Sequence, residues 1–518
     1  MRKKLLVTGL ALASFISMHA GGLLTNTNQN VAFLRNPARG ASIEIDAAYT
    51  NPAGLAFLKK DGFFLSLNNQ SAFQTRTITA DFAPFAGFGG SAVKEFEGKA
   101  KALVIPNLQA AYKTGNWVFS TNIGVVGGGG SLDFSKGLPS FESKIAAPIA
   151  QLSGTANIPT TYSLDSRLEG SSMTLGVQLG ATYKINDMFS AYIGGRVNIV
   201  NNGYKGYLRN VSIAQADNLT AYFTGAASMA NGVVSNLQSA INGGFGEAPL
   251  SALGLPEAQI AQMAAGLKMT AEQISSLSVK DVQGAFSGLA TQATGAVAGI
   301  AQLTNTNLNL DAKQTGIGVA PIIGFHYNWD RLNIGIKYEF KTGLELKNDT
   351  KENSTGVEDY NDKVTTPYDI PALFTVGAQY DILPQLTVSA GYHHFFDSNA
   401  KMAHDKQKFI NGGINEYLAG VEYRINDMFL VSCGTQFTRT GVTDDYQSDM
   451  NFSLNSYSLG FGGAINITKD IRVNLAYFFT NYDDWTKNPP VGGTIIGGEK
   501  DTFGRTNKAF GIGMELRF

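Results

Sequence analysis

The chain has 518 residues and a formal net charge of −1, so its charge does not point to nucleic acid or another strongly charged partner. Only 16% of the residues are charged, 11% are aromatic and 59 are glycine, which is unusual for a soluble enzyme and suits a sheet with one face in lipid. The single cysteine, Cys433, excludes an intrachain disulfide framework and a cysteine metal cluster.

The first residues are typical of a secretory signal peptide, which we predict over residues 1–20. A basic start at residues 2–4 is followed by a short apolar run at 5–18 and a plausible cleavage point after Ala20. Beyond it, no apolar run reaches the ~18 residues that a membrane helix needs. A membrane-spanning chain of this composition would therefore cross with strands.

Residues 21–58 lack the alternation of the chain that follows, and we predict that they form an N-terminal hatch. The segment is rich in small residues and asparagine, and it contains two Asn-Pro-Ala triplets, the second at Asn51, Pro52 and Ala53. Asn-Pro favours a turn, because proline excludes the helical region for the residue before it. We expect a compact plug of turns and short helices, with the second triplet as its turn into the first strand.

Most of the chain after Leu58 alternates between large apolar residues and small or polar ones, as the strands of outer-membrane barrels do. The connections alternate between short turns rich in Asn, Asp, Gly and Pro and long loops. The sequence thus predicts an all-β fold: a transmembrane antiparallel β-barrel of about 14 strands over residues 59–518. An even strand number puts both ends on the periplasmic side, so the hatch enters the lumen from there. The predicted runs are 62–81, 95–113, 117–134, 169–185, 188–209, 307–328, 331–346, 367–382, 385–397, 413–425, 428–440, 453–467, 471–485 and 501–518.

The connection 210–306 is too long for a structureless loop, and we predict a helical extracellular insertion. Its apolar residues recur at intervals of three or four, which is helical spacing. Three or four helices over the outer mouth are expected, with an apolar face that either captures ligand or packs only on the other helices. The residues assigned to this capture face are Val282, Phe286, Leu289 and Ile300.

The third predicted strand, 117–134, begins regularly and then contains four consecutive glycines, Gly127, Gly128, Gly129 and Gly130. Glycine within a strand usually marks a bulge, a bend or a close approach. A bend here would open the barrel wall sideways. The alternative is the flexible start of a loop.

In the order and number of these features, the sequence resembles the FadL/TodX family of outer-membrane transporters for long-chain fatty acids and hydrophobic hydrocarbons. The resemblance rests on Asn51-Pro52-Ala53, on the Val104 to Leu108 stretch, on the glycine-rich third strand, on the insertion between strands five and six, and on the terminal Phe518. It implies a fourteen-stranded barrel blocked by a hatch. It also implies capture of ligand among the outer loops, an inner pocket, and sideways exit at a kink in the third strand. The long third outer loop departs from better-known members, which leaves the outer capture site and the ligand open.

Charged residues on the inward parity of the strands are candidates for binding ligand or holding the hatch. A carboxylate head group would need one or two buried cations, and Arg196 and Lys337 are the candidates because they lie nearer mid-strand. Arg424, Glu515 and Arg517 lie near the periplasmic rim and are predicted to hold the hatch. The alternative for each is pairing with another charge of the wall or hatch.

No catalytic residues are predicted. The one His/Asp grouping worth naming is His393-His394 with Asp397, and the sequence shows neither a nucleophile nor an oxyanion site beside it. There is no phosphate loop and no metal-ligand spacing, so we expect no cofactor, no metal and no nucleic acid. The expected partners are outer-membrane lipid, a hydrophobic ligand such as a fatty acid, and barrel-assembly machinery that reads Phe518. A monomer is expected.

The sequence therefore predicts a passive outer-membrane transporter for hydrophobic molecules, above all long-chain fatty acids. An amphiphile gains about 0.8 kcal/mol per buried methylene, so a path of apolar pockets needs no energy source. Two alternatives remain. One is a porin for polar solutes, and the other is a surface adhesin or receptor that uses the long helical insertion.

Overall fold

The computed structural model describes residues 23–488 and 500–518. The predicted signal peptide and the first two residues of the predicted hatch lie outside this range. Within it, no helix is both long enough and apolar enough to cross a membrane.

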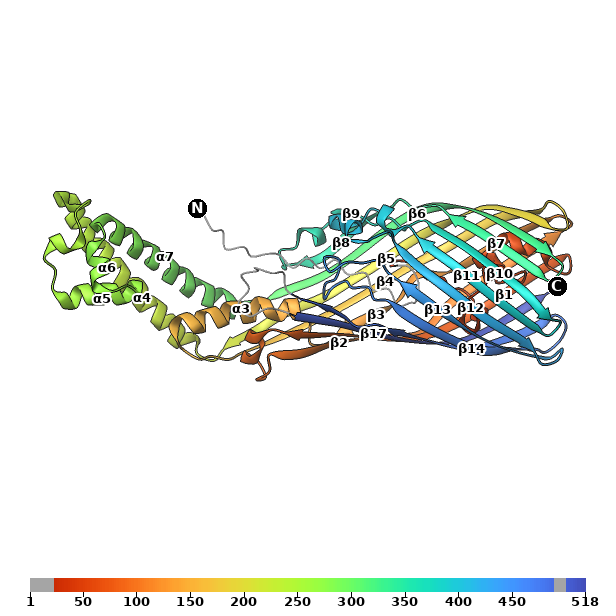
Figure 1. The fold of residues 1–518 in the computed structure, drawn as a ribbon, viewed down its shortest axis with the longest axis horizontal. Helices are drawn as coiled ribbons and strands as arrows, with labels where there is room; N and C mark the ends of the chain where they lie inside the picture. Colours follow the sequence, from red (N-terminus) through yellow and green to blue (C-terminus); the bar gives the residue numbers. More distant parts are fainter. Residues whose placement is uncertain (1–22, 489–499) are drawn as a thin grey trace.

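Fourteen antiparallel strands close into one barrel (Figure 1), which confirms the predicted fold class. The first strand pairs with the second on one side and with the last on the other, and this pairing closes the sheet. The short β9 (Thr365–Pro367) and β16 (Trp485–Lys487) extend the sheet at the outer end. The barrel strands are β1 (Gly62–Asp81), β2 (Val93–Thr114), β3 (Trp117–Phe134), β4 (Tyr162–Lys184), β5 (Phe189–Ile213), β6 (Leu308–Trp329), β7 (Leu332–Glu339) continued by β8 (Glu345–Asn353), β10 (Leu373–Leu383), β11 (Leu386–Phe395), β12 (Ile414–Arg424), β13 (Phe429–Arg439), β14 (Ser456–Asn466), β15 (Ile471–Tyr482) and β17 (Lys500–Arg517).

Several predicted strand ends are wrong on the outer side of the barrel. β4 begins at Tyr162 rather than 169, and the predicted run 331–346 is interrupted after Glu339 and continues in β8 to Asn353. The predicted run 367–382 corresponds to β10, which begins later, at Leu373. Beyond the lipid, outward side chains are polar, so the alternation that marks a strand in the membrane loses its contrast.

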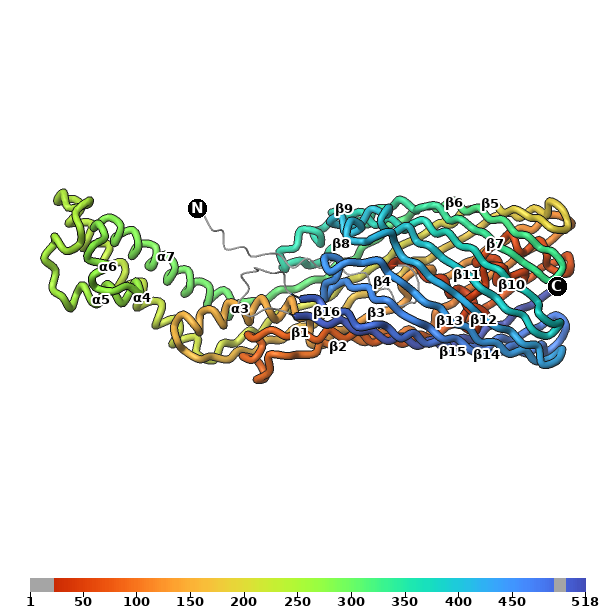
Figure 2. The backbone as a smooth tube through the Cα atoms, in the orientation of Figure 1, coloured from red at the N-terminus to blue at the C-terminus, as the bar shows by residue number. Residues whose placement is uncertain are grey.

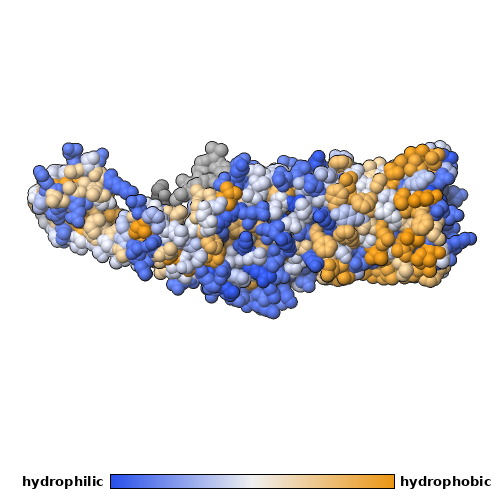
Figure 3. Space-filling model, turned by 90° about the horizontal axis from the view of Figure 1, so that it is seen from below, coloured by the Kyte–Doolittle hydropathy of each residue, from blue (hydrophilic) through white to orange (hydrophobic). Residues whose placement is uncertain are grey.

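On the face seen in Figure 3, an apolar band covers the barrel near the end that carries the C-terminus and the short turns. Side chains such as Ile193 and Ile317 are 70% and 66% exposed in it. Aromatic residues lie at its periplasmic edge, where the rings of Trp117 and Tyr183 have centroids 4.7 Å apart. A closed barrel with an outward apolar band bounded by aromatic residues is built to face lipid.

Residues 23–58 lie inside the periplasmic part of the barrel, where Figure 2 shows the red start of the chain. They form α1 (Val31–Arg35), α2 (Ala47–Thr50) and the 3₁₀ helix η1 (Pro52–Phe57). Gly40 is seated between two wall glycines, because a Cβ on Gly335 would lie 2.1 Å from its carbonyl oxygen and one on Gly377 would lie 2.7 Å from its Cα. The wall thus accommodates the hatch by backbone contact.

The other end of the barrel carries helices. α3 (Pro139–Ala156) lies over the mouth beside η2 (Ala83–Gly87), and its Glu142 pairs with Lys94 and accepts a hydrogen bond of 2.7 Å from Tyr162. The insertion after β5 forms a helical hairpin that extends away from the barrel rather than lying over its mouth (Figures 1 and 2). Its helices are α4 (Ala216–Ala240), α5 (Glu257–Leu267), α6 (Ala271–Ser276) and α7 (Val279–Thr304).

Candidate functional site

The wall of the barrel has a gap between β2 and β3. Their pairing stops at Ala100 of β2 and resumes only at Asn107. Residues 101–106 of β2 and 125–131 of β3 therefore face each other without a hydrogen-bonded ladder. We call this break the gap.

The four-glycine run forms the β3 side of the gap. The register between β3 and β4 shifts twice, between Val125 and Gly127 and between Gly128 and Gly130. Gly128 and Gly129 have backbone φ values of 67° and 116°, which residues other than glycine rarely adopt. These residues therefore bulge the strand and separate it from β2, at the position where the sequence places a kink.

The first residues of the hatch, 23–30, close the gap from inside, and we call them the arm. The backbone N–H of Asn26 donates to the carbonyl oxygen of Val126 at 2.7 Å. The side-chain amide of Asn26 donates to the carbonyl oxygen of Gly128 at 3.3 Å. The arm thus bonds to β3 over the stretch that β2 leaves without a ladder.

Two further contacts hold the arm against β3. Gln29 donates from its side-chain amide to the carbonyl oxygen of Val125 at 3.0 Å. The carbonyl oxygen of Leu24 lies so close to the strand that a Cβ on Gly127 would be 2.2 Å from it. Only glycine permits this approach, so the kink and the arm fit each other.

An apolar cluster, which we call the lumen cluster, lies on the inner side of the arm. Leu23 and Leu24 of the arm belong to it, so the arm contacts this cluster as well as β3. Its other members come from the wall and the outer loops. They are Val200, Leu344, Leu346, Tyr368, Ile370, Leu373, Phe395, Met402, Ile410, Ile414, Val442 and Tyr446.

The outer side of the gap faces lipid. Leu103 and Val104 of β2 are 56% and 70% exposed there. Ser71 of β1 donates from its hydroxyl to the carbonyl oxygen of Leu103 at 2.7 Å, which supports the strand where its partner is lost. Exposed apolar side chains therefore border the gap on its outer side.

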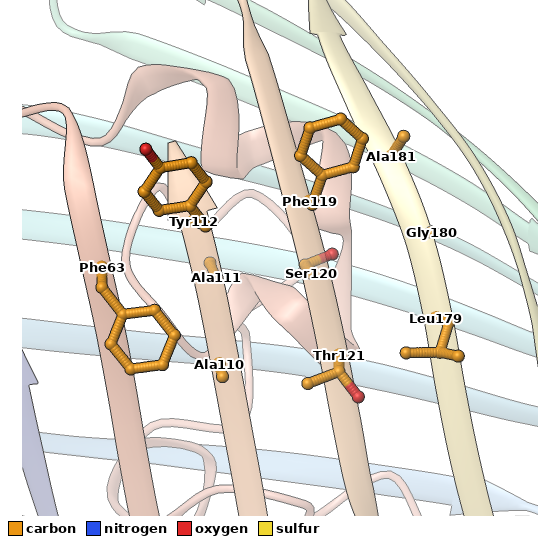
Figure 4. Close-up of a pocket in the computed structure, with 10 residues that line it drawn as sticks. All are labelled: Phe63, Ala110, Ala111, Tyr112, Phe119, Ser120, Thr121, Leu179, Gly180 and Ala181. Atoms are coloured by element: carbon orange, nitrogen blue, oxygen red, sulfur yellow. The ribbon is translucent and has the colours of Figure 1, made fainter. Parts of the chain in front are cut away.

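A shallow groove of about 500 Å³ lies on the same outer wall, nearer the periplasmic end (Figure 4). The side chains of Phe63, Tyr112, Phe119 and Leu179 surround shorter ones there. The sheet separates this groove from the lumen cluster, so it is part of the lipid-facing band and not the interior pocket. The shorter lining residues are Ala110, Ala111, Ser120, Thr121, Gly180 and Ala181.

Arg196 and Lys337, the predicted head-group residues, lie together in the lumen. Both bind Glu339, with N–O distances of 2.8 and 2.6 Å. Both also lie over the ring of Tyr49 in the hatch, 4.8 and 4.9 Å from its centroid. Tyr49 in turn donates to the carbonyl oxygen of Asn26 in the arm at 2.8 Å. These contacts connect the wall to the arm, and the head-group role stays a prediction.

The three predicted rim charges do not pair directly with the hatch. Arg424 is exposed, and Glu515 is buried 3.8 Å from both Arg517 and Arg472. Among the described residues, none of these three predicted charges forms an ion pair with a hatch side chain. Glu515 instead lies behind Arg472, which itself binds Glu44 of the hatch at 2.7 Å.

A second wall charge also holds the hatch. Arg35 of α1 is completely buried and binds Glu422 of β12 at 2.6 Å. Its guanidinium also donates to the hydroxyl of Ser432 at 2.7 Å. Parity places Glu422 and Arg472 inside the barrel, but their partners in the hatch could not be assigned from the sequence.

The Asn51-Pro52-Ala53 triplet is bound by three neighbouring wall strands. The side-chain amide of Asn51 donates to the carbonyl oxygen of Phe325 at 3.0 Å. Thr182 and Ser190 donate to the carbonyl oxygens of Pro52 and Ala53 at 2.8 and 2.7 Å. The triplet therefore fastens the end of the hatch before the chain enters β1.

Sequence reasoning missed a pair of lumen cations. Arg76 of β1 and Arg505 of β17 are direct cross-strand partners on the inner face. Arg76 is buried with its guanidinium 5.2 Å from the ring centroid of Phe452, and that of Arg505 lies 4.7 Å from the centroid of Tyr482. Every second residue of a strand lies on the same face. Arg505 therefore shares the inward face of β17 with Glu515 and Arg517, and the sequence pattern could have placed it in the lumen.

The predicted capture face lies inside the hairpin. Val282 and Phe286 are fully buried in the hairpin's own core, and Leu289 packs against that core. Ile300 is buried in a separate cluster at the base of the hairpin. This burial agrees with the alternative in which these residues pack on other helices. Capture by them stays a prediction that would require the hairpin to open.

The His/Asp grouping does not assemble as a catalytic site. His393 Nδ1 lies 2.8 Å from Glu416, whereas Asp397 accepts from the backbone N–H of Ile414 at 3.0 Å. Burial, together with a smaller effect of the nearby Glu416, raises the pKa of Asp397 to about 7. In the described part of the chain, no three His, Cys, Asp or Glu side chains are grouped so that they could hold a metal ion.

Two solved structures have a similar architecture. The chain is similar to a Pseudomonas aeruginosa FadL homologue with a TM-score of 0.57 and 12% identity, over 96% of this chain and 100% of that one. It is also similar to a deltaS2S3 mutant of the TodX monoaromatic hydrocarbon channel with a TM-score of 0.51 and 15% identity, over 94% and 99%. No protein-family model and no curated protein sequence matches the chain. The closed barrel, the plug within it and these similarities show that the chain has the FadL/TodX-type fold.

Proposed function

We propose that the protein is an outer-membrane transporter for the passive uptake of hydrophobic molecules, with long-chain fatty acids as its ligands. The observation that carries this proposal is the gap between β2 and β3, where the arm bonds to β3 and packs Leu23 and Leu24 into the lumen cluster. The two similar structures are described as a FadL homologue and a monoaromatic hydrocarbon channel, which supports an apolar cargo.

In this proposal, a ligand enters from the outer mouth, binds in the lumen cluster and leaves sideways when the arm is displaced. Displacement breaks three hydrogen bonds to β3, from Asn26 and Gln29, at a net cost of about 0.5–1.5 kcal/mol each. A bound chain gains about 0.8 kcal/mol per buried methylene, so a few methylenes offset that cost. Transport then needs no energy source.

The pair of Arg76 and Arg505 supports an acid as the ligand. The two arginines are direct cross-strand partners on the inner face, so they place two positive charges side by side in the lumen, which suits an anionic ligand. A fatty acid would place its carboxylate near these guanidinium groups and its chain in the lumen cluster.

Uptake of labelled oleate by cells with and without the gene tests the proposal. Replacement of Gly127 to Gly130 by bulky residues should reduce uptake to the level of cells without the gene, because the arm could no longer fit against β3. Gly284→Leu is the matched control, since nothing lies within 4 Å of a Cβ at that glycine of α7. Unchanged uptake without the gene and in the four-glycine variant would refute the proposal.

Electrical conductance separates the proposal from a porin for polar solutes. The hatch bound to several wall strands should leave little conductance in a planar bilayer. A large steady conductance of the purified protein would favour the porin instead.

A further inference from the structure

Two lysines flank a phenylalanine on the outer wall beside the gap. Lys101 of β2 and Lys508 of β17 are both direct cross-strand partners of Phe73 on β1. Both lysines are exposed, and Nζ of Lys101 lies 6.0 Å from the ring centroid of Phe73. Neighbouring strands are about 4.8 Å apart, so the two lysine backbones are separated by roughly 10 Å. Their long side chains can therefore reach one anion from both sides.

The charges of these lysines are not balanced nearby. Lys99, one outward position further from the membrane, pairs with Glu97 at 2.5 Å. Neither Lys101 nor Lys508 forms an ion pair with any residue in the described ranges 23–488 and 500–518. An anion from outside the chain would find both ammonium groups accessible.

The row Lys101–Phe73–Lys508 lies at the outer edge of the apolar band. Phe63 marks the periplasmic edge, and Phe73 lies ten residues further along β1. Ten residues at about 3.4 Å each, on a strand tilted by about 40°, rise roughly 25 Å. This is about the height of the apolar band of an outer-membrane barrel. The two ammonium groups therefore reach the head-group layer of the outer leaflet.

The same row borders the gap. Lys101 is the first residue of the unpaired stretch of β2, and the exposed Leu103 and Val104 follow it toward the hydrocarbon layer. Beside them, β1 presents Asn69 and Ser71 on its outward parity, where a lipid-facing strand normally carries apolar residues. Polar groups facing hydrocarbon cost free energy, which a passing polar head group would offset.

We propose that Lys101, Phe73 and Lys508 form an exit site that binds the carboxylate of an amphiphile as it leaves through the gap. This inference rests on the proposed transport function and specifies its ligand as an anionic amphiphile. The ammonium groups hold the carboxylate at the interface while the chain moves from the lumen cluster into the outer leaflet. A neutral hydrocarbon makes no such contact, so the two lysines favour acids over hydrocarbons of the same length.

The test compares initial uptake rates of labelled oleate and of a labelled neutral C18 alkene in cells that produce Lys101→Gln/Lys508→Gln. The double variant loses two exposed ion pairs with the carboxylate, so oleate uptake should fall roughly twofold to thirtyfold. Alkene uptake should not change. Lys313→Gln is the matched control, because this exposed outward lysine lies on β6, away from the gap, and its loss should leave both rates unchanged. Surface labelling confirms equal amounts of folded protein.

An equal loss of both substrates would overturn the exit site and assign the lysines to anchoring the barrel on lipid phosphates. Unchanged oleate uptake in the double variant would also overturn it, while leaving the transport function intact. If cells with the wild-type protein import neither substrate faster than cells without the gene, the transport function itself fails, and the exit site fails with it.

Discussion

Single charged residues fasten the hatch, and Arg35 offers a direct test. Its guanidinium is fully buried and is bound by Glu422. Removing one partner of a buried ion pair leaves an uncompensated charge and costs about 3–5 kcal/mol. Glu422→Gln should therefore lower the free energy of unfolding in urea by roughly 3 kcal/mol.

The control for this prediction is Lys60→Gln, which breaks an ion pair with Asp470 at the rim. Both side chains of that pair are more than half exposed, at 68% and 53%, so its loss should change the free energy of unfolding by less than about 0.5 kcal/mol. Equal changes in the free energy of unfolding for the two variants would show that the ion pair between Arg35 and Glu422 does not stabilise the protein.

Asp397, in the loop after β11, should make stability depend on pH. Burial raises its pKa to about 7 in the folded protein, above its usual 3.8, so folding favours the protonated carboxyl. Its contribution is therefore fully present below pH 4 and is lost as the pH rises toward 7. Asp397→Asn resembles the protonated acid, so the variant should gain stability relative to wild type over this range, by on the order of 1–4 kcal/mol.

Urea unfolding of both proteins at pH 4, 6 and 8 measures this difference. Because Glu416 also raises the pKa of Asp397, Glu416→Gln should move the transition toward lower pH. A difference between Asp397→Asn and wild type that is constant across the three pH values would contradict the prediction.

At the scale of elements, the hatch divides into a fixed body and a thin arm. Side chains from β4 to β6 and the charges Glu422 and Arg472 hold the body. The start of the arm is held to β3 by three hydrogen bonds from Asn26 and Gln29, whereas Asn28 and Asn30 at its end bond to Gln70 of β1 and Gln109 of β2. Elements with few contacts open at the lowest free energy, so we expect the arm to move while the body stays in place.

Disulfides can test this division after Cys433, which is exposed, is replaced by serine. Cysteines at Asn26 and Val126 would tie the arm to β3, since these residues are joined by a backbone hydrogen bond. Oxidation should abolish oleate uptake, and a reductant should restore it. Cysteines at Asn36 and Ser389, whose side chains are 3.1 Å apart, tie the body to the wall and should leave uptake unchanged. The reverse pattern would show that the body is the moving part.

The helical hairpin has a core of its own, and its outer part should be dispensable for the barrel. The core runs from Ala230 to Ala290, whereas Leu219, Phe223 and Ile300 pack in a different cluster at the base. Replacing 229–290 by a short turn should leave the stability of the barrel and oleate uptake unchanged. Loss of uptake would return ligand capture to the hairpin, and loss of adhesion alone would favour a receptor role.

The sequence was most informative where the lipid imposes a pattern. The bounds of β1 and β3 and the break at the four glycines could be predicted, because outward apolar alternation and glycine carry strong local signals. The upper part of β4 and the interruption between β7 and β8 could not, because outward residues there face water. The contacts of Asn26 and the pairing of Arg76 with Arg505 depend on register between distant segments, which no local pattern contains.

At the scale of the whole molecule, different parts of the hatch close the lumen toward the periplasm and toward the lipid. The hatch body closes the way to the periplasm with backbone contacts and buried ion pairs. Toward the lipid, the arm lies at the gap and bonds to β3 there. For an apolar molecule in the lumen cluster we therefore expect the lowest barrier sideways, toward the hydrocarbon layer, where its transfer is also favourable.

Photocrosslinking with a diazirine fatty acid tests this route most directly. The wild-type protein in its membrane is loaded from outside, irradiated and digested, and the labelled residues are identified by mass spectrometry. Sideways exit predicts label on the arm and on Leu103, Val104 and Pro106 at the gap. Label concentrated instead on the periplasmic side of the hatch, around Glu44 and Pro52, would contradict it.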